Sequence, residues 1–519
     1  MNVFESLLLL LVAAVLLAAA ARRVGAPYPA FLAIGGAVLA FLPHRPAIVM
    51  EPELTLALFV APILLDAAYD ASPRDLKDNW VALTALVIGA VGVTTAAVAW
   101  MTVLLIPTVP WSAAIVVGAV VAPPDAAAAT AVLRQLRPPH RIMTILGGES
   151  LLNDATALLI YRVAAGAAVA RTFEPTHLVP AFLLGVAGSV VVGPLLAWLV
   201  TPLMRKVRDV PTSVILQFVS TFGVWILAEH LGLSAVLTMV CYAVAIARRA
   251  PEWFPANMRV PSYAVWETAV FVLNVLAFVL IGLQIRPVLG ALEPAVRTRY
   301  FIVAGAVLGT VIAVRMIWVL MCAALMRWQA RRRVDGKRHE TVIMPTFGGS
   351  LIVSWCGMRG IVTLAAALAL PGPESGAEFP FRDLIVLTSF AVVIGTLLVQ
   401  GLTLRPLLLA IDVHDDDLVN REVALARTRA IQAAVDALGT DSSPPAAAVR
   451  EELNERLATA SHGARSPRTP HDRLRRSAVA AARQTLLHLR DSGTIGDDAF
   501  HVVEEELDWL EMSGTTGEA

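Results

Sequence analysis

Residues 147 to 156 read Gly-Gly-Glu-Ser-Leu-Leu-Asn-Asp-Ala-Thr, inside an otherwise apolar run at residues 142–169. A run of that length crosses a bilayer as a helix, because about 20 apolar residues span the hydrocarbon core. A charged side chain at bilayer depth is costly, so such a residue faces a cavity, pairs with another charge, or carries a proton or an ion. Glu149 and Asp154 therefore mark this run as a functional helix rather than as lipid-facing structure.

The composition of the whole chain agrees with a membrane protein. Of its 519 residues, 57% are hydrophobic and only 16% are charged, whereas a typical soluble domain has about 25% charged residues. A soluble globular protein is thereby excluded. Runs such as Leu7 to Ala21 do not alternate with a period of two, as the strands of a transmembrane barrel do. We predict an all-α polytopic membrane protein.

The apolar runs predict about 13 transmembrane helices before residue 411. Lys and Arg number 19 in the loops on one side and six on the other, and basic loops stay cytoplasmic. We therefore expect the N-terminus outside, the C-terminus in the cytoplasm, and a bacterial cell membrane as the location. The predicted spans are 5–21, 27–43, 52–69, 80–106, 111–133, 142–169, 178–203, 212–229, 231–247, 263–285, 300–326, 345–370 and 383–410.

The composition changes after Asp412-Val413-His414-Asp415-Asp416-Asp417. We place the transmembrane domain at 1–411 and a helical, regulatory cytoplasmic tail at 412–519. Helical patterning in the tail covers Arg421 to Leu438, Val449 to Ala460 and Arg473 to Leu510. Ser461 to Pro470 is expected to separate the last two of these helices.

The polar residues of span 6 form two stripes. On a helix, Ser150 and Asp154 are four residues apart and share one face, while Glu149 and Asn153 share the adjacent face. Ser and Asn alone would be explained by polar contacts between helices. Two carboxylates make that explanation insufficient.

Two other spans are interrupted. Pro123 and Pro124 remove two backbone donors just before Asp125, so span 5 must break there. Span 12 contains Gly348-Gly349 and then Cys356-Gly357-Met358-Arg359-Gly360. Broken helices at membrane depth are tolerated where they line a cavity, and their free carbonyls bind cations. If spans 1–6 and 8–13 are two inverted repeats joined by span 7, the two breaks occupy equivalent positions.

The remaining charges inside the predicted spans are Asp66 in span 3, Glu267 in span 10, Arg315 in span 11 and Arg359 in span 12. Each buried arginine needs an anion or another acceptor. Glu267 and Asn274 are seven residues apart and share a face of span 10. Contact of this pair with an ion path is the less favoured interpretation.

The segment Gly148 to Asp154, the proline-broken span with Asp125 and the downstream Gly357-Met358-Arg359-Gly360 resemble the monovalent cation/proton antiporter family, which includes the bacterial and animal sodium/proton exchangers. The resemblance covers roughly residues 1 to 410. It implies a homodimer in which a dimerisation domain flanks a mobile core, with spans 5 and 12 crossing at the ion site.

The resemblance also implies roles for single residues. Asp154 binds the transported Na⁺ or a proton, and Ser150 is a further ligand of that ion. Glu149 pairs with an arginine, for which Arg315 is favoured, and Arg359 supports the crossing near Asp125. Asn153, Asp125 and Asp66 are further candidate ion- or proton-binding residues, and Asp66 stands where many members have Glu. The Pro124-Asp125-Ala126 stretch lacks the threonine hydroxyl common in the family and leaves the Pro124 carbonyl available.

The expected mechanism is competition between Na⁺ and a proton for Asp154, with alternating access of the core. Asn153 in place of a second Asp leaves one titrating carboxylate, a pattern that the resemblance associates with electroneutral exchange. Exchange of Na⁺ or Li⁺ for H⁺ is the favoured function, and K⁺/H⁺ exchange is the alternative.

A cation channel, which needs ligands from several subunits, is less favoured. An enzyme is not expected, because His-Glu-x-x-His and Gly-x-Ser-x-Gly motifs are missing from the sequence. We expect no cofactor and no nucleic-acid partner.

Overall fold

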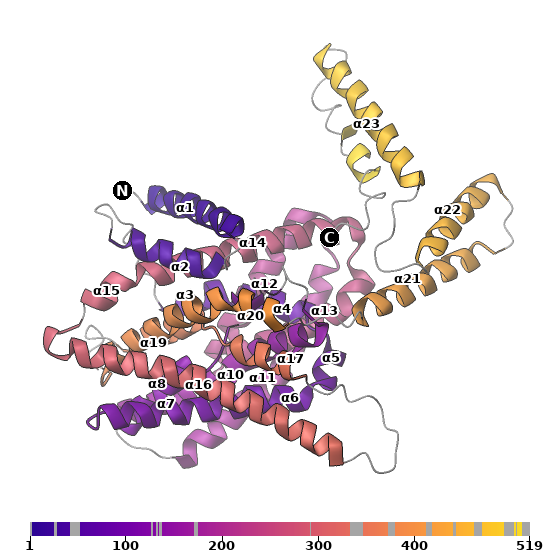
Figure 1. Ribbon diagram of the computed structural model, residues 1–519. Coiled ribbons are helices and arrows are strands. Elements are labelled where there is room, and N and C mark those ends of the chain that lie inside the picture. Colours follow the sequence, from indigo (N-terminus) through magenta and orange to yellow (C-terminus); the bar gives the residue numbers. More distant parts are fainter. Residues whose placement is uncertain are drawn as a thin grey trace. The chain divides into compact units, whose positions relative to one another are not determined.

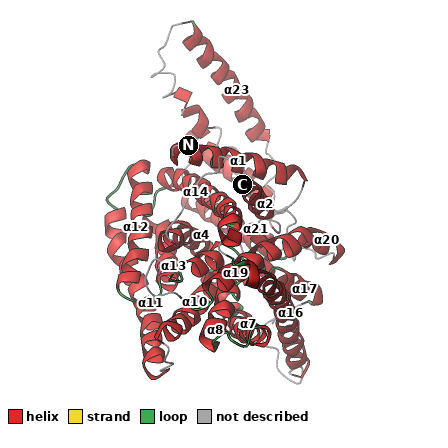
Figure 2. Cartoon of the chain, turned by 90° about the vertical axis from the view of Figure 1, so that its left-hand side faces the viewer, coloured by secondary structure: helices red, strands yellow, loops and turns green. Residues whose placement is uncertain are grey.

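The chain divides into two compact units, Met1–His414 and Asp415–Ala519. The computed structural model describes residues 3–24, 28–41, 52–125, 128–130, 133, 138–170, 175–290, 292–332, 346–371, 379–411, 418–439, 443–460, 470–492, 503–504 and 506–510. Within these ranges all regular structure is helical, and no strand occurs (Figure 2). The predicted boundary segment Asp412 to Asp417 lies outside the described residues.

The helices of the first unit follow the predicted apolar runs (Figure 1). The first seven runs contain α1 (Val3–Val24), α2 (Tyr28–Leu39), α3 (Pro52–Thr55), η1 (Leu56–Val60), α4 (Ala61–Asp70), α6 (Trp80–Thr84), η2 (Ala85–Ala90), α7 (Val91–Leu105), α8 (Trp111–Val121), α10 (His140–Ala170) and α11 (Pro175–Met204), with the short α5 (Pro73–Asp78) between the third and fourth runs. The last six runs contain α12 (Val210–His230), α13 (Ala235–Trp253), α14 (Ala256–Leu283), α16 (Pro294–Arg332), α17 (Phe347–Trp355), α18 (Ile361–Leu368), α19 (Arg382–Thr396), η4 (Leu397–Gly401) and α20 (Leu402–Ile411), with α15 (Ile285–Gly290) after the tenth run.

Six helical stretches in the described residues are long and apolar enough to cross a membrane. They are Trp80–Leu105, Leu184–Met204, Val210–His230, Ala256–Gly290, Pro294–Gln329 and Arg382–Ile411. Four shorter apolar helices, of 10–17 residues, accompany them. Each of the 13 predicted runs thus holds helix, but the count of 13 spans and the inverted repeats stay predictions.

Side-chain caps explain where several helices begin. Asp209 accepts a hydrogen bond of 2.9 Å from the backbone N–H of Thr212 at the start of α12. Ser234 accepts one of 3.3 Å from Leu237 at the start of α13. Such caps satisfy backbone donors that the first helical turn leaves free.

Glycines allow α2 and α14 to approach each other closely. A Cβ atom added at Gly36 of α2 would lie 2.2 Å from the carbonyl oxygen of Val279 in α14. One added at Gly282 of α14 would lie 2.1 Å from that of Ala33. Glycines at such contacts let helix backbones approach closely in a membrane.

Buried apolar side chains form two large clusters. One is built mainly on α2, α4, α13 and α14, and the other on α8, α16 and α19. Figure 1 shows α7 beside α8 and α16, and the contacts of α7 with both helices agree. Helices α10, α18 and α19 contribute side chains to both clusters, so polar residues on these helices lie between two packed apolar bodies.

The second unit is also helical. Helices α21 (Leu418–Ala437) and α22 (Pro444–Ala460) pack on each other, and α23 spans Pro470–Asp491. Of the segment Arg473 to Leu510, for which helical patterning is predicted, α23 covers the first part, Ser492 lies in a turn, and residues 503–504 and 506–510 are helical; residues 493–502 lie outside the described residues. Gly493 follows in the sequence, and glycine is a weak helix former. The predicted break at residues 461–469 lies outside the described residues.

Candidate functional site

The central helix of the candidate site is α10, which carries Glu149, Ser150, Asn153 and Asp154. Glu149 and Asn153 are buried, whereas Ser150 and Asp154 are only partly buried. The stripe with Glu149 and Asn153 is therefore packed inside the protein. The stripe with Ser150 and Asp154 is the more accessible of the two.

The two predicted helix breaks meet each other. Helix α8 ends at Val121, and residues 122–125 continue without helix. Helix α17 ends at Trp355, and residues 356–360 have no regular structure before α18 begins. The backbone N–H of Asp125 donates a hydrogen bond of 2.7 Å to the carbonyl oxygen of Met358. This contact confirms that spans 5 and 12 meet at their irregular segments.

Arg359 satisfies the carbonyl groups that the break leaves free. Its Nε donates to the carbonyl oxygen of Val121 at 2.9 Å, and its Nη2 donates to that of Ala122 at 3.1 Å. Its Nη1 also donates to the carbonyl of Gly357. The last carbonyls of a helix carry partial negative charge, so a cation is favourable there. Arg359 is 1% exposed, and its charge is held by these backbone dipoles.

Asp125 lies against the start of α18. A Cβ atom added at Gly360, the residue before α18, would lie 1.7 Å from Asp125 Oδ2. Only a glycine leaves room for the carboxylate at this point. The position also places negative charge at the N-terminal end of a helix, which is electrostatically favourable. The opposite charges of Asp125 and Arg359 thus sit at opposite kinds of helix end.

Asn153 joins α10 to the break in span 5. Its Nδ2 donates a hydrogen bond of 2.7 Å to the carbonyl oxygen of Pro124. Its Oδ1 is buried and accepts no hydrogen bond from the described residues. A carbonyl oxygen has two lone pairs, so the Pro124 oxygen keeps one for a further partner.

Asp154 lies near this junction as well. Its carboxylate and that of Asp125 are close enough to interact electrostatically. Two neighbouring carboxylates together with amide and backbone oxygens are the donor set that hard cations prefer. The structure therefore brings together Asp154, Asp125, Asn153 and Pro124. No group of three or more His, Cys, Asp or Glu side chains suited to hold a metal occurs in the described residues.

Glu149 is paired with Arg315 of α16. Arg315 Nη1 donates to Glu149 Oε1 at 2.5 Å, and Nη2 donates to Oε2 at 2.9 Å. Nη2 also donates to the carbonyl oxygen of Val353 in α17 at 3.1 Å. Glu149 thus pairs with the arginine that the family resemblance favoured. The pair connects three helices around the candidate site.

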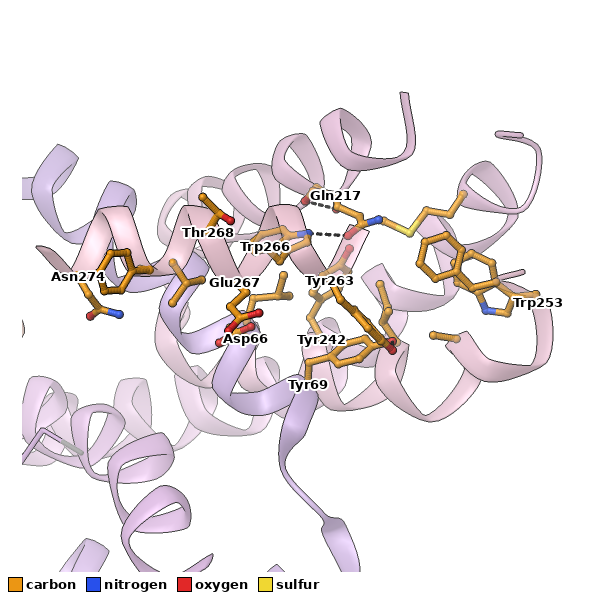
Figure 3. Close-up of a pocket in the computed structure, with 18 of the residues that line it drawn as sticks. Asp66, Tyr69, Gln217, Tyr242, Trp253, Tyr263, Trp266, Glu267, Thr268 and Asn274 are labelled. Atoms are coloured by element: carbon orange, nitrogen blue, oxygen red, sulfur yellow. Dashed lines mark hydrogen bonds between the residues drawn. The ribbon is translucent and has the colours of Figure 1, made fainter. Parts of the chain in front are cut away.

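Asp66 lies on the wall of a cavity of about 720 Å³, together with Glu267 and Asn274 (Figure 3). Asp154 is not among the described residues that line this cavity. Contact of Glu267 and Asn274 with an ion path is the less favoured interpretation of the sequence. The sequence spacing does not show that these two residues lie near Asp66, because span 3 and span 10 are about 200 residues apart.

Thr396 of α19 was missed by the sequence analysis. Its hydroxyl accepts a hydrogen bond of 3.1 Å from the backbone N–H of Arg359, and it is fully buried. A single threonine in an apolar span is common and gives no signal in the sequence. Thr396 contacts Arg359 only because α19 packs on the break in span 12.

The chain also resembles known proteins. A family described as "Sodium/hydrogen exchanger, transmembrane" matches residues 8–410. An uncharacterized Na⁺/H⁺ exchanger of Mycobacterium tuberculosis is 32% identical over 508 residues, which cover 94% of this chain and 92% of that protein. A sodium, potassium, lithium and rubidium/H⁺ antiporter of Bacillus subtilis is 25% identical over 94% of this chain and 74% of its own length.

The fold has a solved counterpart. The sodium proton antiporter MjNhaP1 from Methanocaldococcus jannaschii matches with a TM-score of 0.60 at 17% identity, over 79% of this chain and 98% of that chain. The match of a family across most of the chain, the relative with 32% identity and this shared fold agree with one another. The chain belongs to the sodium/hydrogen exchanger family of membrane antiporters.

Proposed function

We propose that this protein exchanges Na⁺ or Li⁺ for H⁺ across the cell membrane, and that Asp154 is the group for which the two compete. The observation that carries the proposal is the junction of two broken helices, at Asp125 N–H and Met358 O, beside the Asp154 carboxylate. Broken helices in a membrane expose backbone oxygens and helix ends to a transported ion. A lone buried carboxylate without such a junction would not support transport.

The ligand set follows from the donors near this junction. Asp154 and Ser150 supply a carboxylate and a hydroxyl from one face of α10, and Asn153 Oδ1 and the Pro124 carbonyl supply neutral oxygens. Asp125 keeps its position at the start of α18 and adds its negative charge to the site from there. Asp66, on the wall of the separate cavity, is proposed to concentrate cations near the site rather than to hold them with Asp154.

Alternating access follows from neutralisation of Asp154. We propose that the core moves across the membrane when either Na⁺ or a proton occupies this carboxylate, and not when it is empty and charged. With Asn153 in place of a second acid, one positive charge moves in each direction, and exchange is electroneutral. Such exchange serves pH homeostasis.

The assembly is proposed on the same family grounds. A homodimer would hold the dimerisation domain still while the core moves as an elevator. The 13 spans would form two inverted repeats, with the N-terminus outside and a regulatory tail in the cytoplasm.

Potassium is the second candidate for the transported cation. The Bacillus subtilis relative is named for sodium, potassium, lithium and rubidium exchange. Selectivity among these ions depends on cavity size and on the number of ligands. A channel is not proposed, because the relatives are antiporters.

The proposal is tested in proteoliposomes that contain a pH-sensitive dye, with Na⁺, Li⁺ and K⁺ added in turn. We expect Na⁺ and Li⁺ to move protons at rates that do not change when the membrane potential is clamped with valinomycin and K⁺. Proton movement by K⁺ alone would replace the sodium assignment with the potassium one. If none of the three ions causes proton movement, the proposal is overturned.

A further inference from the structure

The cavity that contains Asp66 has the size of an organic ligand site. Its volume is about 720 Å³, and its walls come from α2, α4, α11, α12, α13 and α14. Pockets for small organic molecules commonly measure about 300–1,000 Å³. A single alkali ion would fill only a small part of this space.

The cavity is acidic. Asp66 of α4 and Glu267 of α14 both line it (Figure 3). The described lining residues include these two acids and no Lys, Arg or His. The local field therefore attracts positive charge and repels anions.

The rest of the lining is rich in aromatic rings that are held in place. Trp266 Nε1 donates a hydrogen bond of 2.6 Å to Gln217 Oε1, and its ring stacks on Phe218 at a centroid distance of 4.4 Å. The rings of Tyr69 and Tyr263 meet at 6.0 Å, with their hydroxyl oxygens 3.3 Å apart. Aromatic faces attract ammonium and guanidinium groups. Fixed rings do so without loss of side-chain freedom on binding.

Tyr242 supplies a buried hydroxyl to the wall. It is 1% exposed and lines the cavity, and its hydroxyl lies near that of Ser220. The Ser220 hydroxyl donates to the carbonyl oxygen of Gln217 at 2.9 Å. The Tyr242 oxygen therefore keeps a lone pair that can accept a hydrogen bond from a group in the cavity.

We propose that this cavity binds an organic cation, with a protonated amine between Asp66 and Glu267 and a hydrocarbon body against the aromatic wall. The carboxylates supply the charge, and the rings of Tyr263 and Trp266 supply the apolar surface. The inference does not depend on the exchange reaction, because binding is measured without transport.

The test compares two probes of equal size and different charge. Benzylamine is protonated at pH 7, and benzyl alcohol is its neutral counterpart. Dissociation constants are measured for the purified full-length protein by saturation-transfer difference NMR. We expect wild-type protein to bind benzylamine more tightly than benzyl alcohol. Glu267→Gln should weaken benzylamine binding by about threefold to tenfold and leave benzyl alcohol unchanged.

Two further variants control the result. Glu293→Gln removes an exposed acid outside the cavity and should leave both probes unaffected. Tyr263→Leu removes an aromatic face that is 47% exposed and keeps the apolar bulk, so it should weaken benzylamine more than benzyl alcohol. Equal binding of the two probes to wild-type protein would overturn the proposal. Unchanged benzylamine binding in folded Glu267→Gln protein would overturn it too.

Discussion

Both guanidinium nitrogens Nη1 and Nη2 of Arg315 are hydrogen-bonded to the carboxylate of Glu149, at 2.5 and 2.9 Å, and each side chain is 2% exposed. A bidentate pair in this position neutralises two charges that would otherwise be buried without a counter-ion in a low dielectric. The pair also fixes α10 relative to α16, and through the Val353 carbonyl relative to α17. Its first role is thus to hold the helix that carries Asp154.

Glu149→Ala should therefore damage folding before it damages ion binding. Removing one partner of a buried pair costs about 3–5 kcal/mol, because the remaining charge has no counterpart. Thermal unfolding of the purified protein measures the loss. Glu452→Ala is the matched control, because it breaks the 2.9 Å pair with Arg456, both partly exposed, in the second unit. That control should cost at most about 1 kcal/mol. Loss of transport in Glu149→Ala protein with unchanged unfolding would contradict the role.

Gly360→Ala should disrupt the crossing of the two broken helices. The added methyl group would meet Asp125 Oδ2 at 1.7 Å, so either the carboxylate or the break in span 12 must shift. Overpacking of this kind costs about 1–3 kcal/mol. We expect exchange to fall strongly in proteoliposomes. Gly309→Ala in α16 is the control, because its Cβ would meet no atom within 4 Å. Full activity of Gly360→Ala protein would show that the contact with Asp125 is dispensable.

Asp154→Asn should abolish exchange while the protein still folds. The substitution keeps the side-chain volume and removes the only group on that helix face that can hold either a proton or the charge of a cation. Asp78→Asn changes an exposed carboxylate in α5 and should leave exchange intact. The measurement is Na⁺-dependent proton movement together with a thermal unfolding curve. Substantial exchange by folded Asp154→Asn protein would remove Asp154 from the mechanism.

Much of this site could be predicted because its signals are local in the sequence. Pro123 and Pro124 require a helix break wherever they occur in an apolar run, and α8 ends at Val121 accordingly. Glu149 and Asp154 stand out because carboxylates are rare in apolar helices. These residues resemble the motifs of a known family, and the match of the family across residues 8–410 confirms that resemblance.

The remaining contacts depend on tertiary packing. Nothing in the sequence links Arg359 to the carbonyls of Val121 and Ala122, because backbone acceptors have no side-chain signature. The same applies to the neighbourhood of Asp66 and Glu267, which come from spans far apart in the chain. In the tail, the helical pattern from Arg473 to Leu510 gave no signal for the turn at Ser492.

Truncation after residue 411 should leave the pH dependence of exchange in place. The first compact unit holds every residue of the proposed site, so the competition at Asp154 needs no residue of the tail. The pH profile of the truncated protein in proteoliposomes is expected to remain bell-shaped, with a possible shift of its optimum. A rate that no longer depends on pH would place pH sensing in the tail.

The most direct test of the account is the apparent Km for Na⁺ measured at a series of pH values, equal on both sides of the membrane. If Na⁺ and a proton compete for Asp154, the Km for Na⁺ is constant above the pKa of the site. Below that pKa, the Km rises about tenfold for each unit by which the pH is lowered. The maximal rate at saturating Na⁺ then changes much less over the acidic range. A Km that stays constant while the maximal rate falls with pH would contradict competition at a shared carboxylate.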